Sequence, residues 1–335
     1  MFALENKVAA AVVAAASVLA PGAALSDCKL LQMAEFKLDP AYRSPVTDGE
    51  INGQPIKVLF DTGAAISLVD RAAAIRLKLP LFDTGGRVVG IGGESEVASA
   101  RIASLKIGEF AKSNMELAVA GDPRATDDPA LTLGSDFLAQ VDIEFDMAHG
   151  ALRLFRHVGC QPPQLVYWGA AYSQATLLQW SRDAPKLQAE AQVNGRQVLA
   201  ELDSGASFSI MDVNAASAAG AKPAGLKDSV ARGVGAAPQT ISAVRLDSFS
   251  LGDETVSHVT VETTRLKEDF TYTEIGSITP RHYDSTPSML VGDDFFRAHR
   301  IFFDTQDHLI LFSYAGGPVF ETPPDATPAT SAPRK

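Results

Sequence analysis

An internal repeat constrains the fold of this chain more than any other feature. The segment INGQPIKVLFDTGAAISLVD (residues 51–70) aligns with VNGRQVLAELDSGASFSIMD (residues 193–212) at a constant offset of 142 residues. LTLGSDFL (131–138) aligns with MLVGDDFF (289–296), in the same order along the chain. Landmarks repeated in one order indicate two copies of one structural unit. The 335 residues are enough for two domains of ordinary size.

Each copy is predicted to be mainly β. Short apolar or alternating runs are separated by Gly, Pro and Asp, and the Asn-Gly pairs at 52–53 and 194–195 indicate tight hairpins. The Ala-rich stretches 71–77 and 213–220 predict a turn or two of helix each. A further short helix is expected after each hydrophobic-Gly landmark. Its candidate caps are Ser135 or Asp136 in the first copy and Asp293 or Asp294 in the second.

The boundaries of the chain's segments follow from the repeat and from local composition. Residues 1–26 are interpreted as a secretory signal peptide, because Lys7 precedes an apolar run that is too short for a comfortable membrane span. An uncleaved anchor is the alternative. The other expected segments are a first lobe (27–158), a linker (159–164), a second lobe (165–317) with an insertion within 264–288, and a disordered tail (318–335).

Composition excludes some classes of function. The hydrophobic fraction of 46% and the charged fraction of 21% are those of a globular protein. A net charge of −11 argues against a nucleic-acid partner. The six His residues are scattered and no zinc spacing is present, so the sequence predicts neither a metal nor a cofactor.

Only two cysteines are present, Cys28 and Cys160. Export to an oxidising compartment favours a disulfide between them, which would tie the start of the mature chain to the end of the first copy. Two unpaired thiols are the alternative. Lipidation of Cys28 is a weaker one, because Asp27 fits a lipoprotein cleavage box poorly.

Asp61 and Asp203 each end an apolar strand at a tight Thr/Ser-Gly-Ala turn. Duplicated lobes that pack about a pseudo-twofold axis would bring these two loops face to face. Two touching carboxyl groups share one proton, so one can accept a proton from a water while the other donates to a substrate carbonyl. The hydroxyls of Thr62 and Ser204 could bond across the axis. For a single Asp-Thr-Gly the plain interpretation is a turn cap, but two copies favour a joint role.

The motifs FDTGA and LDSGA resemble the active-site motif of retropepsin-like aspartic proteases. In that family Gly63 and Gly205 would shape the catalytic loops, and the LTLG and MLVG segments would pack behind them. The resemblance implies two β-barrel lobes related by a pseudo-twofold axis. It also implies flap tips in GIGG (Gly90, Ile91, Gly92, Gly93) and GVGA (Gly233, Val234, Gly235), although a plain hairpin turn fits these segments equally well.

Some residues depart from the family pattern or have a plainer interpretation. Glu201 replaces an expected apolar residue two positions before Asp203 and could perturb the Asp pair. No counterpart of the flap Tyr of pepsin-like enzymes is evident. Asp70 and Asp212 are predicted to be structural or solvated, and Asp136 and Asp294 to be helix caps. A surface loop is expected for Arg281, His282 and Tyr283 in the insertion.

The sequence therefore predicts an exported, periplasmic or secreted aspartic endopeptidase. Asp61 and Asp203 would form the water-activating pair, supported by Thr62, Gly63, Ser204 and Gly205. The expected partner is an extended peptide or protein substrate laid between the lobes of a monomer, with no stable membrane span after signal cleavage. The alternatives are a non-catalytic peptide-binding protein of the same fold and a dimer with two sites.

Overall fold

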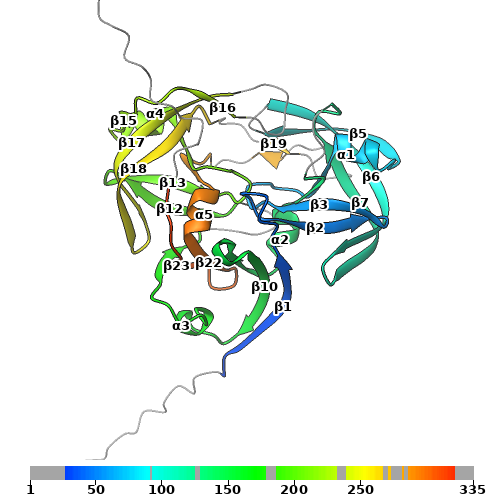
Figure 1. The fold of residues 1–335 in the computed structure, drawn as a ribbon, viewed down its shortest axis with the longest axis horizontal. Coiled ribbons are helices and arrows are strands. Elements are labelled where there is room, and N and C mark those ends of the chain that lie inside the picture. Colours follow the sequence, from blue (N-terminus) through cyan, green and yellow to red (C-terminus); the bar gives the residue numbers. More distant parts are fainter. Residues whose placement is uncertain are drawn as a thin grey trace, which may run out of the picture.

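The fold described here comes from a computed structural model (Figure 1). The described residues are 27–90, 93–124, 129–178, 186–231, 239–266, 271–272, 281–282 and 286–320. The chain is mainly β and forms two closed six-stranded barrels, one from each copy of the repeat, which confirms the predicted fold class. The predicted signal peptide lies outside the described residues, as does the tail beyond Phe320.

The first barrel is built from strands of residues 46–133. Parallel pairing of β3 with β8 and of β4 with β7 places the ends of β3 and β8 side by side, and pairing of β2 with β6 closes the barrel. Strand β5 (Leu81–Gly90) extends the sheet as a hairpin with β6. In order around the barrel the strands are β2 (Val46–Ile51), β3 (Gln54–Phe60), β8 (Leu131–Leu133), β4 (Leu68–Asp70), β7 (Phe110–Ala120) and β6 (Gly93–Ile107).

The second barrel repeats this plan. Pairing of β12 with β17 closes it, and β15 (Lys222–Pro223) and β16 (Ser229–Ala231) are added along β17. The predicted Asn-Gly hairpins are confirmed in both copies, because Asn52 and Asn194 have φ of 51° and 52° and the glycines that follow also have positive φ. In order the strands are β12 (Gln188–Val193), β13 (Arg196–Leu202), β21 (Met289–Val291), β14 (Ile210–Asp212), β18 (Glu254–Thr264) and β17 (Gln239–Leu251).

The helices are short and flank the barrels. The expected helices after the hydrophobic-Gly landmarks and in the Ala-rich stretches are confirmed. Asp70 and Asp212 cap α1 and α4, each accepting bonds from two backbone N–H groups. The helices are α1 (Arg71–Arg76), α2 (Ser135–Leu138), α3 (Pro162–Leu165), α4 (Val213–Ala218), α5 (Asp293–Ala298) and the 3₁₀ turn η1 (Met147–His149).

The predicted caps of α2 and α5 are wrong. Gly134 and Gly292 occupy the cap positions and make no side-chain cap bond. The carboxylates of Asp136 and Asp294 instead reach the preceding loop, where each accepts from a serine N–H and hydroxyl. A capping carboxylate accepts from N–H groups of its own first turn. Asp294 accepts one such bond, from the Phe295 N–H at 3.0 Å, but both Asp side chains also satisfy donors about 70 to 85 residues earlier in the chain.

A third, six-stranded sheet joins the two copies below the barrels (Figure 1). Its central pair is antiparallel, with β9 from the first copy beside β22 from the second. Cys28 and Cys160 form a disulfide at the outer edge of this sheet. The strand order is β1 (Lys29–Lys37), β10 (Ala151–Val158), β9 (Asp142–Asp146), β22 (His299–Asp304), β23 (Leu309–Tyr314) and β11 (Ser173–Thr176).

The residues predicted as a linker hold regular structure, since Cys160 is buried and α3 begins at Pro162. The insertion of the second copy contributes β19 (Thr271–Tyr272) and β20 (Arg281–His282), and β19 pairs with β5 of the first copy. Tyr283 lies outside the described residues. None of the helices in the described ranges has the length and apolarity that crossing a membrane requires.

Candidate active site

Asp61 and Asp203 occupy equivalent positions at the ends of β3 and β13. In β3 buried residues alternate with partly exposed ones up to the buried Phe60, whereas the last three residues of β13 are all buried, so burial fixes both strands up to their last residue. The backbone N–H of Asp61 then donates to the Leu133 carbonyl at 2.9 Å, and that of Asp203 donates to the Val291 carbonyl at 2.9 Å. Both aspartates are therefore anchored by the parallel strand beside them.

Each aspartate is held a second time through its side chain. The N–H groups of Gly63 and Ala64 donate to Oδ1 of Asp61 at 2.9 and 3.1 Å. The same two bonds are made to Oδ1 of Asp203, at 2.9 and 3.2 Å. Both aspartates keep part of their surface accessible, although protein surrounds each carboxyl on most sides. One oxygen of each carboxyl is thus fixed by backbone donors.

The two carboxyl groups lie against one another. A β-carbon on Gly63 would lie 2.4 Å from Cγ of Asp203, and a β-carbon on Gly205 would lie 2.4 Å from Cγ of Asp61. Neither position can therefore hold any residue other than glycine without moving the opposite carboxyl. The two carboxyl groups are also hydrogen-bonded to each other. The structure brings both predicted aspartates together.

Thr62 and Ser204 lock the two loops across the interface, and both are fully buried. The Thr62 N–H donates to Oγ of Ser204 at 3.1 Å, and the Ser204 N–H donates to Oγ1 of Thr62 at 3.0 Å. Each hydroxyl donates in turn to a carbonyl of the opposite copy, Thr62 to Leu202 at 2.6 Å and Ser204 to Phe60 at 2.8 Å. Each loop is therefore fastened to the strand that carries the other aspartate.

A carboxylate-hydroxyl pair supports each loop from behind. In the second copy, Asp294 accepts from the N–H and the hydroxyl of Ser209 at 3.0 and 2.6 Å. The Ser209 hydroxyl accepts from the Gly292 N–H at 2.9 Å. The first copy repeats this with Asp136, Ser67 and Gly134. The hydrophobic-Gly landmarks of the sequence are therefore the segments that pack behind the two loops.

The two aspartates differ in their electrostatics. Burial raises the pKa of Asp203 to about 7, with a further contribution from the charge of Asp61. Burial also raises the pKa of Asp61, but the backbone donor Gly63 and the hydrogen bond from Asp203 oppose this rise. These directions favour Asp203 as the group that holds the shared proton, within a pair that titrates as a unit.

Lys186 is a buried cation beside the pair that sequence reasoning missed. Its Nζ lies 2.7 Å from Oε1 of Glu201 and 3.5 Å from the Gly63 carbonyl. Burial lowers the pKa of the Lys186 ammonium, but the charges of Glu201, Asp203 and Asp61 outweigh burial and the net direction is upward. The positive charge in turn lowers the pKa of both aspartates. A lone lysine after the linker forms no motif, so the sequence carried no signal for it.

Glu201, which the sequence suggested could perturb the Asp pair, forms this ion pair with Lys186 and also accepts from Gln188 at 3.4 Å.

A second difference between the two copies was also missed by sequence reasoning. Ser44 donates to Oδ2 of Asp293 at 2.5 Å, and burial raises the pKa of Asp293 well above its usual value. The position equivalent to Asp293 in the first copy is Ser135, so the surroundings of the two active loops carry different charges.

The flap prediction is only partly within the described residues. Gly90 and Gly93 are paired at the end of the β5–β6 hairpin. Ile91 and Gly92 lie outside the described residues, and so do the candidates Gly233, Val234 and Gly235. The role of these segments as flaps stays a prediction.

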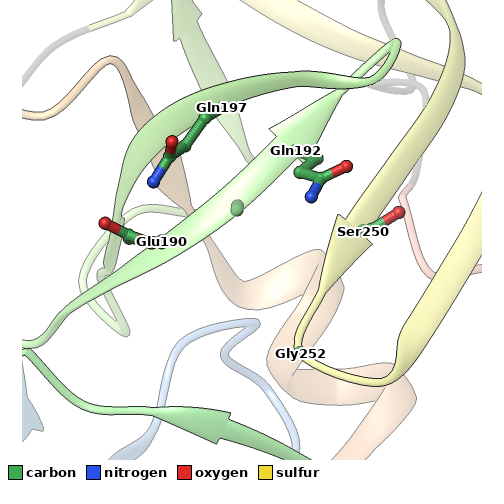
Figure 2. A pocket seen from close by; sticks show the side chains of 6 residues that line it. Glu190, Gln192, Gln197, Ser250 and Gly252 are labelled. Carbon is green, nitrogen blue, oxygen red and sulfur yellow. The ribbon is translucent and has the colours of Figure 1, made fainter.

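A separate hollow of about 350 Å³ lies on the second barrel, over β12, β13 and β17 (Figure 2). Its lining includes no predicted site residue and no His or Cys, and it offers one carboxylate among amides, a hydroxyl and backbone. Glu190 is the only titratable group in this lining, so the hollow offers no second acid or base to pair with it. The lining residues are Glu190, Ala191, Gln192, Gln197, Ser250 and Gly252.

Two closed barrels with facing Asp-Thr/Ser-Gly loops define a bilobal, retropepsin-like protein of the aspartic protease class. Comparison of the sequence with known families agrees with this. The pattern of the family described as aspartyl protease matches residues 47–137 and again residues 189–292, together more than half of the chain. The chain belongs to the aspartyl protease family, and this membership supports an aspartic-protease-like function. No curated protein matches the sequence.

Proposed function

We propose that the protein is an aspartic endopeptidase that hydrolyses peptide bonds with a water held between Asp61 and Asp203. The main support is the reciprocal packing of each carboxyl over the glycine of the opposite loop. This packing leaves the carboxyl groups in contact, which is what joint activation of one water requires. It also makes the two copies inseparable parts of one site.

The asymmetry of the pair assigns the roles. Ionised Asp61 accepts a proton from the water as its oxygen attacks the substrate carbonyl carbon, and Asp203 donates its proton to the carbonyl oxygen. The tetrahedral intermediate then collapses: Asp61 returns its proton to the amide nitrogen, the C–N bond breaks, and Asp203 recovers a proton from the intermediate's hydroxyl. Thr62 and Ser204 hold the geometry through these steps, so little reorganisation is needed.

Substitution of the pair tests the proposal against a non-catalytic peptide binder. Wild type, Asp61→Asn and Asp203→Asn are incubated with a library of unstructured peptides from pH 3 to pH 8, and products are identified by mass spectrometry. We expect cleavage by wild type alone, and tight binding to wild type of a peptide with a hydroxyethylene group in place of the scissile bond. Equal cleavage by wild type and both variants would remove the Asp pair from the mechanism. Binding of peptides without cleavage would instead establish the binder.

We also propose that the protein is exported and acts as a monomer. The Cys28–Cys160 disulfide is typical of an oxidising compartment, and the sequence of residues 1–26 has the features of a signal peptide. Because one chain supplies both aspartates, a second chain is not needed to complete the site. Mass spectrometry of the protein recovered from its native compartment tests removal of residues 1–26, and light scattering of the active species tests the monomer.

A further inference from the structure

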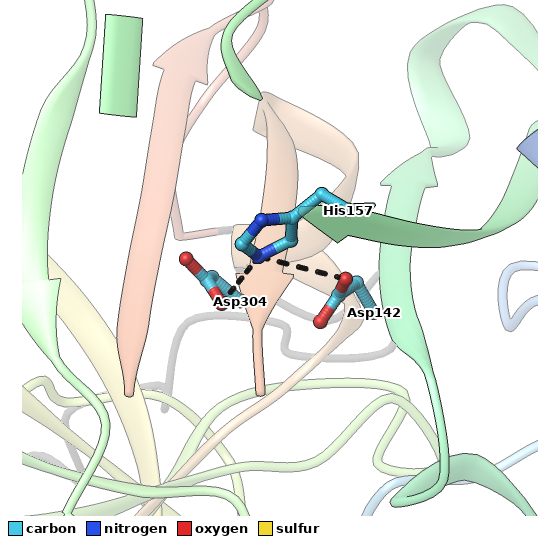
Figure 3. Close-up of side chains that lie close together, drawn as sticks. All are labelled: Asp142, His157 and Asp304. Carbon is cyan, nitrogen blue, oxygen red and sulfur yellow. Dashed lines mark hydrogen bonds and ion pairs between the residues drawn. The ribbon is translucent and has the colours of Figure 1, made fainter. Parts of the chain in front are cut away.

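A buried cluster of two carboxylates and one imidazole lies in the sheet between the lobes, and the active site makes no use of it. Asp142 begins β9, His157 is near the end of β10, and Asp304 ends β22 (Figure 3). All three side chains are at most 3% exposed. One ligand atom from each residue lies within 4.8 Å of the other two. Nε2 of His157 is 3.0 Å from Oδ1 of Asp304 and 3.8 Å from Oδ2 of Asp142.

The pseudo-symmetry of the central strand pair makes the charge of this cluster unusual. Phe302 lies opposite Glu144 in the antiparallel β9–β22 pair, so continuing the register sets Arg300 opposite Asp146 and Asp304 opposite Asp142. At one end of the strand pair Asp146 faces Arg300, and Nη1 of Arg300 lies 3.5 Å from Oδ2 of Asp146. At the other end Asp142 faces Asp304, so two carboxylates lie opposite each other. Two like charges facing each other across strands in a buried position are costly, and a cation between them relieves that cost.

The hydrogen bonds of the cluster leave carboxylate oxygens available to a cation. Oδ1 of Asp142 accepts from the N–H and the hydroxyl of Thr305 at 3.0 and 2.8 Å, and its Oδ2 has only a long contact of 3.5 Å to Nε2 of Gln306. Oδ1 of Asp304 accepts from the backbone N–H of Gln306 and of Asp307, both at 3.0 Å. Among the described residues, Oδ2 of Asp304 has no hydrogen-bond donor at all, although it is fully buried.

A divalent metal ion can supply the positive charge that two facing carboxylates lack. A divalent cation with a neutral imidazole and two carboxylates gives a net charge of zero. It would use Nε2 of His157 and one oxygen of each carboxylate.

We propose that Asp142, His157 and Asp304 bind a divalent first-row transition metal ion, with Zn²⁺ as the fitting probe. One imidazole and two carboxylates form a donor set that such ions accept, whereas Mg²⁺ and Ca²⁺ prefer oxygen ligands alone. The site lies in the interlobe sheet and draws ligands from both copies of the repeat, so the ion would stabilise the association of the two lobes. Its role is structural and independent of the proposed peptidase activity.

Zinc content and thermal unfolding of the full-length folded chain test the site. Protein stripped with a chelator is mixed with Zn²⁺, exchanged into metal-free buffer and measured by elemental analysis. We expect one zinc per chain in wild type and an unfolding midpoint that rises on zinc addition. Asp142→Asn and His157→Gln should lose both effects. His149→Gln is the matched control, because His149 pairs with Asp146 at 2.6 Å outside this cluster and its loss should leave zinc binding intact.

A Co²⁺ titration of wild type covers the case in which a variant fails to fold. One equivalent of Co²⁺ should give a visible d–d absorption band that one equivalent of Zn²⁺ abolishes. The proposal is overturned if wild type retains no zinc and gives no cobalt band. It is also overturned if zinc raises the unfolding midpoint of Asp142→Asn as much as that of wild type, since the ion is then adventitious.

Discussion

The Thr62 and Ser204 hydroxyls each donate to the strand that carries the opposite aspartate, so neither loop can move without the other. Replacing both with residues that lack a hydroxyl, as in Thr62→Val with Ser204→Ala, leaves buried carbonyls and N–H groups without partners. We expect a loss of stability of roughly 2–4 kcal/mol and a fall in kcat that exceeds the change in KM.

The matched control for these loops is the exchange Thr62→Ser with Ser204→Thr, which keeps both hydroxyls. Denaturant unfolding and steady-state kinetics should show this double variant close to wild type. If the exchange is as damaging as removal of the hydroxyls, side-chain packing rather than the crossed hydrogen bonds fixes the loops.

The raised pKa of Asp203 predicts a particular dependence of stability on pH. The folded protein holds this proton up to about pH 7, whereas the unfolded chain releases it near the ordinary value of 3.8. The folded state therefore binds more protons between these values, and its stability falls as pH rises through that window. Asp203→Asn cannot ionise, so its stability should exceed that of wild type above pH 7, by up to about 4 kcal/mol. Urea unfolding at pH 3.5 and pH 8 measures the difference, and parallel curves would contradict the assignment.

Lys186 should set the alkaline limit of activity. Its charge lowers the pKa of both aspartates, so removing it should shift the alkaline limb of the kcat/KM profile to higher pH. A single substitution would leave Glu201 as an uncompensated buried charge. We therefore combine Lys186→Met with Glu201→Leu, which restores the residue found at the equivalent position, Leu59. An unshifted profile would contradict a net effect of the ion pair on the aspartates, and a shift to lower pH would show that the charge of Glu201 outweighs that of Lys186 there.

The carboxylates behind the loops should differ in their contribution to stability. Asp294 is 1% exposed, and Asp294→Ala leaves the Ser209 N–H and hydroxyl buried without an acceptor. We expect a loss of about 2–4 kcal/mol. Asp136 is exposed, so water replaces much of what Asp136→Ala removes, and the loss should be about 1 kcal/mol. Chemical denaturation of the two variants compares them, and equal losses would contradict the role of burial.

The sequence predicted the fold and the Asp pair because the duplication repeats the same motifs in the same order. A motif that recurs with its downstream hydrophobic-Gly segment constrains the topology of each copy and indicates that the two Asp loops face each other. Contacts that occur once lacked this signal. Lys186 pairs with Glu201, and Asp304 is hydrogen-bonded to His157, which lies 147 residues earlier in the chain. The caps of α2 and α5 were mistaken because local spacing alone suits a cap, whereas Asp136 and Asp294 have better partners in distant loops.

The six-stranded sheet that joins the two copies has a consequence for the nascent chain. Ile143 of β9 pairs with Phe303 of β22, so the first copy leaves the ribosome well before the strand that covers its edge has been translated. Through that interval β9 presents an apolar edge that a neighbouring nascent chain can extend. Slow initiation, which spaces ribosomes along the message, should therefore raise the yield of native protein. A gene truncated before β22 should direct its product into inclusion bodies.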